Sequence, residues 1–145
     1  MRMHGKIGLV TAAGSGMGKA GAIRFAQEGA SVGVVDINSD AVEAVVKEIK
    51  DAGGNAIGIV ADLTKDDESR YIVTKTANHF EGLDFVWNHI GYPGPASIEG
   101  IEMADFELTL DLNLRTILVT TEAALSEFRI RGGGSLLYTA SSSGL

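Results

Sequence analysis

Short apolar segments alternate with segments of helical spacing along the whole chain. Each apolar segment is about four to six residues long, and its apolar residues are mostly consecutive, as in strands buried on both faces of a parallel sheet. The pattern predicts strands at residues 7–10, 31–35, 56–61, 85–88 and 135–139. Strands that alternate with helical segments favour repeated βαβ units and therefore a parallel sheet.

The segments between these strands carry apolar residues at helical spacing. Residues 40–52 follow a candidate cap at Asn38 and stop before Gly53, and residues 72–80 repeat the same spacing. The longest helix is expected over residues 104–128, with one stripe formed by Phe106, Leu110, Asn113, Leu114, Ile117, Thr121, Ala124, Leu125 and Phe128. The fold class is therefore α/β, and the length of 145 residues predicts a single domain over residues 1–145.

Composition narrows the classes of function. A net charge of -7 is unfavourable for a nucleic-acid surface, and no apolar run approaches the roughly 18 residues of a membrane span. The absence of cysteine removes thiolate nucleophiles, disulfides and cysteine zinc sites, and the 3 histidines have no ligand spacing, so we predict no metal. We expect a cytoplasmic protein that binds small molecules, with a cofactor for any redox chemistry.

A glycine-rich segment follows the first predicted strand, with four glycines between residues 14 and 21. A P-loop is excluded, because Ala13 stands where that motif needs glycine and Ala20 where it needs a hydroxyl. The spacing of Gly16, Gly18 and Gly21 instead fits a loop whose N–H groups and following helix N-terminus bind phosphate. A turn that only packs the helix on the strand is the alternative.

Asp36 follows the second predicted strand, 20 residues after Gly16. A carboxylate at this spacing accepts hydrogen bonds from the ribose 2′- and 3′-hydroxyls of a dinucleotide and repels a 2′-phosphate. Because no arginine follows it to compensate, we predict NAD rather than NADP. A simple helix-leading cap is the alternative role for Asp36.

Taken in order, these motifs resemble those of the short-chain dehydrogenase/reductase family, over the whole chain. The cofactor loop of the family, Thr-Gly-x-x-x-Gly-x-Gly, corresponds to residues 11–18. Ala12 replaces the first glycine of that loop and is expected to fit if its φ is negative. Asp62 and Leu63 correspond to the adenine-contacting pair, and residues 88–91, Asn-His-Ile-Gly, correspond to the family's Asn-Asn-Ala-Gly.

The resemblance implies a Rossmann-type doubly wound parallel sheet with helices on both faces, incomplete after the fifth strand. His89 and Ile90 are bulkier than the usual Asn-Ala pair of the family and alter one wall of the expected cofactor site. The cofactor contacts implied by the resemblance and the spacing are Gly16, Met17, Gly18, Asp36, Asp62, Leu63, Asn88 and Gly91.

The resemblance also implies two residues for the chemistry. Asn113 corresponds to the helix asparagine that holds a water in a proton relay, and within an apolar stripe it is expected to be buried and hydrogen-bonded. A structural hydrogen bond from helix to sheet is the alternative. Ser141, three residues before Gly144, corresponds to the serine that hydrogen-bonds the substrate carbonyl, with Ser142 and Ser143 as adjacent alternatives.

The Tyr-x-x-x-Lys pair of the family, which donates the proton, has no counterpart in the expected place. Tyr71 and Lys75 have the spacing, but they precede the fourth strand on an outer helix, and Tyr138 lies in a strand without a partner lysine. We expect the biological chain to continue past Leu145 and the 145 residues alone to turn over nothing. A fragment that must find a partner is the alternative.

The expected function is an NAD-dependent oxidoreductase that moves hydride between a secondary alcohol and a ketone. Family members commonly form homo-oligomers through the long helix, so self-association of the full-length protein is expected. Two alternatives remain at this point: a non-catalytic NAD-binding or sensor module, and a methyltransferase that uses S-adenosylmethionine. The methyltransferase leaves Asn113, Ser141 and the match at residues 88–91 unexplained.

Overall fold

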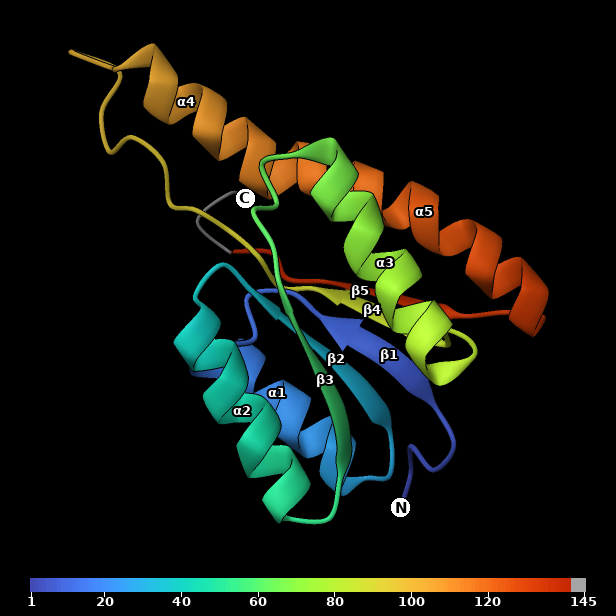
Figure 1. Ribbon diagram of the computed structural model, residues 1–145. Coiled ribbons are helices and arrows are strands. Elements are labelled where there is room, and N and C mark those ends of the chain that lie inside the picture. Colours follow the sequence, from blue (N-terminus) through green and yellow to red (C-terminus); the bar gives the residue numbers. More distant parts are fainter. Residues whose placement is uncertain (142–145) are drawn as a thin grey trace.

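A computed structural model describes residues 1–141 of the chain (Figure 1). Five parallel strands form one sheet in the order β3-β2-β1-β4-β5. The strands are β1 (Ile7–Val10), β2 (Ser31–Asp36), β3 (Asn55–Val60), β4 (Phe85–Asn88) and β5 (Ser135–Tyr138). All five predicted strands are present within one residue of their expected bounds, and the predicted Rossmann-type α/β fold is confirmed.

Helices cover both faces of the sheet, as the doubly wound prediction requires. Figure 1 shows α1 and α2 on one face and α3 and α5 on the other, while α4 projects beyond the sheet. Their bounds are α1 (Gly16–Gln27), α2 (Ser39–Asp51), α3 (Asp66–Phe80), α4 (Met103–Leu110) and α5 (Thr116–Arg131). The side chain of Asn38 accepts a hydrogen bond from the Ala41 amide at 3.0 Å, which confirms Asn38 as the cap of α2.

The long helix differs from its prediction in two ways. A π-helical turn, Asp111–Arg115, interrupts it between α4 and α5, and we call this segment the π-turn. The predicted apolar stripe is mostly exposed, including Leu110 and Leu114, whereas its members Ala124 and Phe128 are buried. The other buried positions of α5, Thr116 and Thr120, lie outside the predicted stripe. A hydrophobicity pattern did not reveal these two threonines because their contacts are polar. The Thr116 hydroxyl binds the Leu63 carbonyl after β3, and the Thr120 hydroxyl binds Asn88 of β4.

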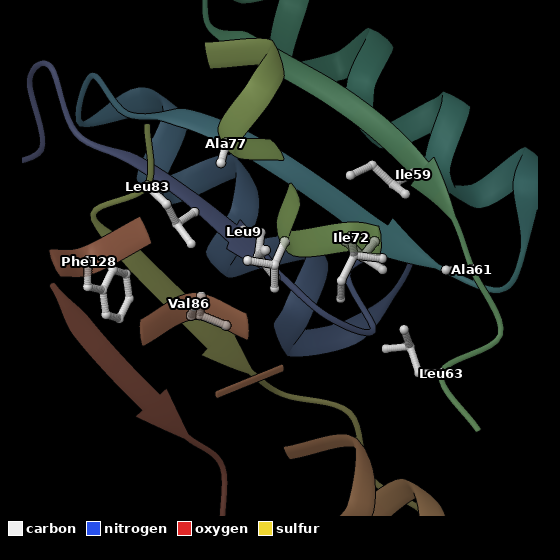
Figure 2. Close-up of a cluster of buried hydrophobic side chains, with 12 residues drawn as sticks. Leu9, Ile59, Ala61, Leu63, Ile72, Ala77, Leu83, Val86 and Phe128 are labelled. Atoms are coloured by element: carbon white, nitrogen blue, oxygen red, sulfur yellow. The ribbon is translucent and has the colours of Figure 1, made fainter. Parts of the chain in front are cut away.

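Two hydrophobic clusters lie on opposite faces of the sheet. The cluster drawn in Figure 2 joins β1, β3 and β4 to α3 and α5, with Leu9 and Val86 at its centre and Ile72 and Phe128 contributed by the helices. The other cluster joins the sheet to α1 and α2. Burial of β1 and β2 on both faces explains their continuous apolar sequence.

Asp84 ties three elements together at the amino ends of the strands. Its carboxylate accepts the Ile7 amide at 2.9 Å and the Arg131 guanidinium at 2.9 Å, and Lys6 lies 3.7 Å away. Burial alone raises the pKa of this carboxyl, but the hydrogen bonds and charges of Arg131, Ile7 and Lys6 lower that pKa below its ordinary value of 3.8. The ionised form therefore stabilises the fold.

We predict that Asp84→Asn lowers the free energy of unfolding by about 2 kcal/mol at neutral pH, because the amide loses a charged hydrogen-bond network. A lowered pKa contributes stability above the unfolded value, so the difference from the parent shrinks as the pH falls below 3.8. Urea titrations at several pH values measure this. Glu43→Gln on the exposed face of α2 is the control, and a pH-independent difference for Asp84→Asn would contradict the account.

Candidate cofactor and active site

The candidate residues gather at the carboxyl ends of the strands, where β1 lies between β2 and β4. In open α/β sheets this point, where the strand order reverses, is where ligands bind. The segments that follow β1, β2, β3 and β4 all emerge at this edge because the strands are parallel. Residues far apart in sequence are therefore brought together here.

The glycine loop leads from β1 into α1. A Cβ added to Gly18 would lie 2.1 Å from the carbonyl oxygen of Ala12, so only glycine allows α1 to begin so close to the end of β1. Gly16 has a positive φ of 53°, with no atom within 4 Å of an added Cβ. Met17 is largely exposed at the helix start. The loop thus presents backbone N–H groups at a helix N-terminus, as an anion site needs.

Ala12 has a φ of 51°, contrary to the expectation of a negative φ at this position. The left-handed region strains a residue with a Cβ by about 1 kcal/mol. The chain therefore keeps the backbone conformation of the glycine it lacks, because the tight turn between β1 and the glycine loop imposes it.

We predict that Ala12→Gly stabilises the protein by about 0.5–1 kcal/mol, since relief of the strained φ exceeds the added entropy of the unfolded chain. Denaturant titration measures the change. The neighbouring Ala13 has a fully buried side chain and no positive φ, so Ala13→Gly should destabilise by a similar amount. Destabilisation of the Ala12→Gly protein would contradict the strain.

Two backbone amides, one in the glycine loop and one after β2, hold the carboxylate of Asp36 at the end of β2. Its Oδ2 accepts the Gly14 amide at 2.9 Å, and its Oδ1 accepts the Asn38 amide at 3.1 Å. A Cβ on Gly14 would lie 2.9 Å from this carboxylate, so Gly14 is needed for the contact. The carboxylate retains further acceptor sites, because its two oxygens offer about four lone-pair positions.

A pocket of about 510 Å³ opens beside Asp36, within the range of small-ligand sites. It brings four of the predicted residues together, namely Asp36, Asp62, Leu63 and Gly91. Ala12 of the cofactor loop and Ile90, expected at one wall of the site, also line the pocket. Sequence reasoning missed the remaining lining side chains, which are Ile37, Ala61, Thr64, Leu108 and Leu112. Leu108 lies in α4 and Leu112 four residues later in the π-turn, and no sequence signal indicated that this part of the long helix lines the pocket.

Asp62 is held as a carboxylate at one wall of the pocket. The Thr64 hydroxyl donates to its Oδ1 at 2.7 Å and lowers the pKa of Asp62 below its usual value, and Lys65 contributes from 3.4 Å. The backbone of the adjacent Leu63 is fixed by two donors, the hydroxyls of Ser69 and Thr116. Hydrogen bonds within the protein thus hold both residues of this wall.

Asn88, which was predicted as a cofactor contact, is the last residue of β4. Its side chain is completely buried, and its Oδ1 accepts the Thr120 hydroxyl at 2.9 Å, so the amide joins β4 to α5. Within residues 1–141 its Nδ2 atom has no hydrogen-bond partner. Of the predicted motif at residues 88–91, Ile90 and Gly91 line the pocket.

His89 connects the glycine loop to β5. Its ring approaches Gly18, where an added Cβ would lie 2.9 Å from the imidazole Cδ2 atom. Its Nδ1 lies 2.8 Å from the Thr139 hydroxyl, which also accepts the Trp87 indole N–H at 3.0 Å. The Thr11 hydroxyl accepts the His89 amide at 3.0 Å, so the segment after β4 is fixed to β1 as well. The His89 ring, bulkier than the asparagine usual in the family, thus lies between the glycine loop after β1 and Thr139 after β5.

Asn113 lies in the π-turn and is exposed, contrary to the expectation of a buried amide. Its Oδ1 accepts the Tyr92 amide at 2.8 Å, and its Nδ2 donates to the Tyr92 carbonyl at 2.7 Å. A Cβ on Gly91 would lie 3.2 Å from the same Oδ1. Asn113 therefore binds the segment that follows β4 rather than the sheet itself, which the sequence alternatives did not include.

Ser141 is exposed and follows β5 at the same edge of the sheet. Tyr138 pairs with Asn88, and the Thr139 amide donates to the Asn88 carbonyl at 3.1 Å, so the chain passes the end of β4 before reaching Ser141. The alternatives Ser142 and Ser143, and the Gly144 that selects among them, lie outside the described residues.

Neither tyrosine considered in the sequence joins this edge as a Tyr-x-x-x-Lys pair. Tyr71 and Lys75 lie within α3 and are exposed, and the Tyr138 hydroxyl is 2.8 Å from the Thr121 hydroxyl of α5. Across residues 1–141, no three His, Cys, Asp or Glu side chains are grouped so as to hold a metal. None of the helices in that range is long and apolar enough to cross a membrane.

Comparison with known proteins identifies the family. Residues 6–145 match the short chain dehydrogenase family. An uncharacterized oxidoreductase of Thermotoga maritima is 36% identical over 145 residues, which are all of this chain and 57% of that protein.

Two solved structures extend the likeness to three dimensions. A 7 alpha-hydroxysteroid dehydrogenase complexed with NADH and 7-oxo glycochenodeoxycholic acid has a TM-score of 0.95 and 35% identity, covering 99% of this chain and 56% of that one. A short chain dehydrogenase from Burkholderia cenocepacia J2315 in complex with NADP has a TM-score of 0.91 and 32% identity, covering 98% and 58%. The chain thus spans little more than half the length of these relatives. It belongs to the short-chain dehydrogenase family of oxidoreductases.

Proposed function

We propose that the protein is an NAD-dependent oxidoreductase that transfers hydride between a secondary alcohol and a ketone. The observation that carries the choice of NAD is Asp36, a carboxylate fixed by the Gly14 and Asn38 amides beside the 510 Å³ pocket. Solved relatives of similar likeness carry NADH in one case and NADP in another, so the family alone does not choose between them. The charge at the end of β2 favours a free ribose over a 2′-phosphate.

The residues present fit a dinucleotide along this edge. The pocket between Asp36 and Leu112 suits an adenosine, with Asp62 and Leu63 on one side. Gly16, Met17 and Gly18 form the N-terminus of α1, where the helix dipole favours an anion, and their backbone N–H groups would bind the pyrophosphate. The bound cofactor supplies the hydride acceptor or donor.

Two residues of this chain would serve the reacting carbonyl. Ser141, which follows β5, would donate a hydrogen bond to the substrate oxygen and so stabilise charge that develops on it. Asn113 would keep the segment after β4 in place by its two hydrogen bonds to Tyr92, which leaves one donor and one lone pair of the amide for a water. The proton donor and the substrate loop belong to the part of the family fold that residues 1–145 do not include.

The test is a spectrophotometric assay for NADH formation with the full-length protein and a panel of secondary alcohols. Relatives named 7alpha-hydroxysteroid dehydrogenase and cyclohexanol dehydrogenase suggest cyclic secondary alcohols for that panel. NAD-dependent turnover of any member supports the proposal. Saturable NAD binding without turnover of alcohols or ketones would favour the non-catalytic sensor. Binding of S-adenosylmethionine without binding of NAD would overturn both readings.

A further inference from the structure

The π-turn is where the two ends of the proposed site meet. Within its five residues, Leu112 lines the pocket beside Asp36 and Asn113 binds the Tyr92 backbone. A π-turn is uncommon and occurs frequently at functional sites, because its wider spacing redirects side chains that a regular helix would aim elsewhere. The contacts that hold the turn therefore determine where both side chains lie.

Thr116 closes the turn at its carboxyl end. Its amide donates to the Asp111 carbonyl, five residues back, and its hydroxyl lies 2.9 Å from the same oxygen. The hydroxyl also lies 2.5 Å from the carbonyl of Leu63, and the Thr116 side chain is buried. The π-turn is thus hydrogen-bonded to the β3–α3 loop, in which Asp62 and Leu63 line the pocket.

Arg115 makes the second connection, to the start of α3. Its Nε donates to Asp66 Oδ1 at 2.7 Å and its Nη2 donates to Oδ2 at 2.9 Å, a bidentate pair. The Arg115 guanidinium lowers the pKa of Asp66 below its ordinary value, so the pair is charged at neutral pH. Asp66 begins α3, three residues after Leu63. Thr116 and Arg115 therefore fix the π-turn at two points, to Leu63 in the β3–α3 loop and to Asp66 at the start of α3.

We propose that the Arg115–Asp66 pair is a positioning element that couples the adenosine end of the site to Asn113. The pair keeps the π-turn in place against the β3–α3 loop, so the pocket wall at Leu112 and the hold of Asn113 on Tyr92 depend on the same ion pair. This inference rests on the proposed function for its effect on NAD, whereas its effect on Tyr92 does not.

The small contribution expected of the Arg115–Asp66 pair to overall stability distinguishes a positioning role from a stabilising one. Both partners are partly exposed, with side-chain exposures of 59% and 37%. Pairs of this kind contribute about 0–1 kcal/mol to stability. A purely structural pair would therefore leave local contacts and ligand affinity unchanged when broken. Breaking a positioning pair changes the local contacts and the ligand affinity even when the melting temperature hardly changes.

The experiment compares Arg115→Met, Asp66→Asn and the double variant in the full-length protein. Amide hydrogen exchange of Tyr92 without cofactor should accelerate about fivefold in each variant, and NAD should bind about fivefold more weakly. The double variant should equal either single variant, because both remove the same pair. Arg115→Lys keeps the charge but not the two-pronged contact, and should lie between parent and Arg115→Met.

Glu122→Gln is the matched control. It breaks the pair between Arg70 of α3 and Glu122 of α5, 3.4 Å apart, which also involves α3 but lies away from the π-turn. Unchanged exchange of Tyr92 in the Arg115 and Asp66 variants, or an equal change in Glu122→Gln, would overturn the inference. If the parent binds no NAD, the proposed function fails, and the exchange comparison still decides whether the pair positions Asn113.

Discussion

Replacement of Gly18 by alanine is expected to weaken NAD binding about tenfold to hundredfold and to destabilise the protein by about 1–3 kcal/mol. The added Cβ would lie 2.1 Å from the Ala12 carbonyl oxygen, a backbone atom that cannot rotate away. Relief requires the start of α1 to move from β1, which displaces the N–H groups proposed to bind the pyrophosphate. Calorimetric titration with NAD and denaturant unfolding measure the two effects.

The Gly16→Ala variant tests backbone strain in the glycine loop without the steric conflict of Gly18→Ala. Gly16 has a φ of 53°, but no atom lies within 4 Å of an added Cβ, so alanine there meets only backbone strain of about 1 kcal/mol. The Gly16→Ala protein should therefore keep more of its NAD affinity than the Gly18→Ala protein. Equal losses in both variants would mean that close packing at Gly18 is not what shapes the loop.

Asp36→Ala should reduce the preference for NAD over NADP by about 10- to 100-fold. The carboxylate is proposed to accept hydrogen bonds from the ribose hydroxyls, and a charged hydrogen bond contributes about 1.5–3 kcal/mol. Removal also ends the repulsion of a 2′-phosphate, so NADP affinity should rise while NAD affinity falls. Dissociation constants of both cofactors, measured under the same salt conditions, give the ratio.

Asp36→Asn controls for the structural hydrogen bonds of this side chain. Its single carbonyl oxygen can accept either the Gly14 or the Asn38 amide but carries no charge. This variant should repel NADP as little as Asp36→Ala does, while the glycine loop is disturbed less. A parent-like preference for NAD in both variants would remove Asp36 as the determinant.

Much of the fold could be predicted because it depends on local patterns. Strands buried on both faces have continuous apolar sequences, so β1 and β2 were readily found. The contact between Asp36 and the Gly14 amide follows the same logic, because parallel neighbouring strands end at one edge and the glycine loop begins there. The 20-residue spacing between Gly16 and Asp36 reflects the position of these two strand ends side by side.

The remaining features depend on tertiary contacts that no local pattern encodes. Thr116 binds both Asp111 and the distant Leu63 carbonyl at the end of the π-turn, and Asn113 in this turn is exposed, like much of the expected stripe. Asn88 is buried because Thr120 provides a hydroxyl partner across the sheet–helix interface. Polar side chains with distant partners therefore account for the main differences between expectation and structure.

Equilibrium titrations of the full-length protein with NAD and with NADP test whether Asp36 selects the cofactor. We expect NAD to bind at least about tenfold more tightly, since Asp36 is proposed to accept the ribose hydroxyls and to repel the added phosphate. NADP binding that equals or exceeds NAD binding would contradict the assignment of the cofactor and of Asp36.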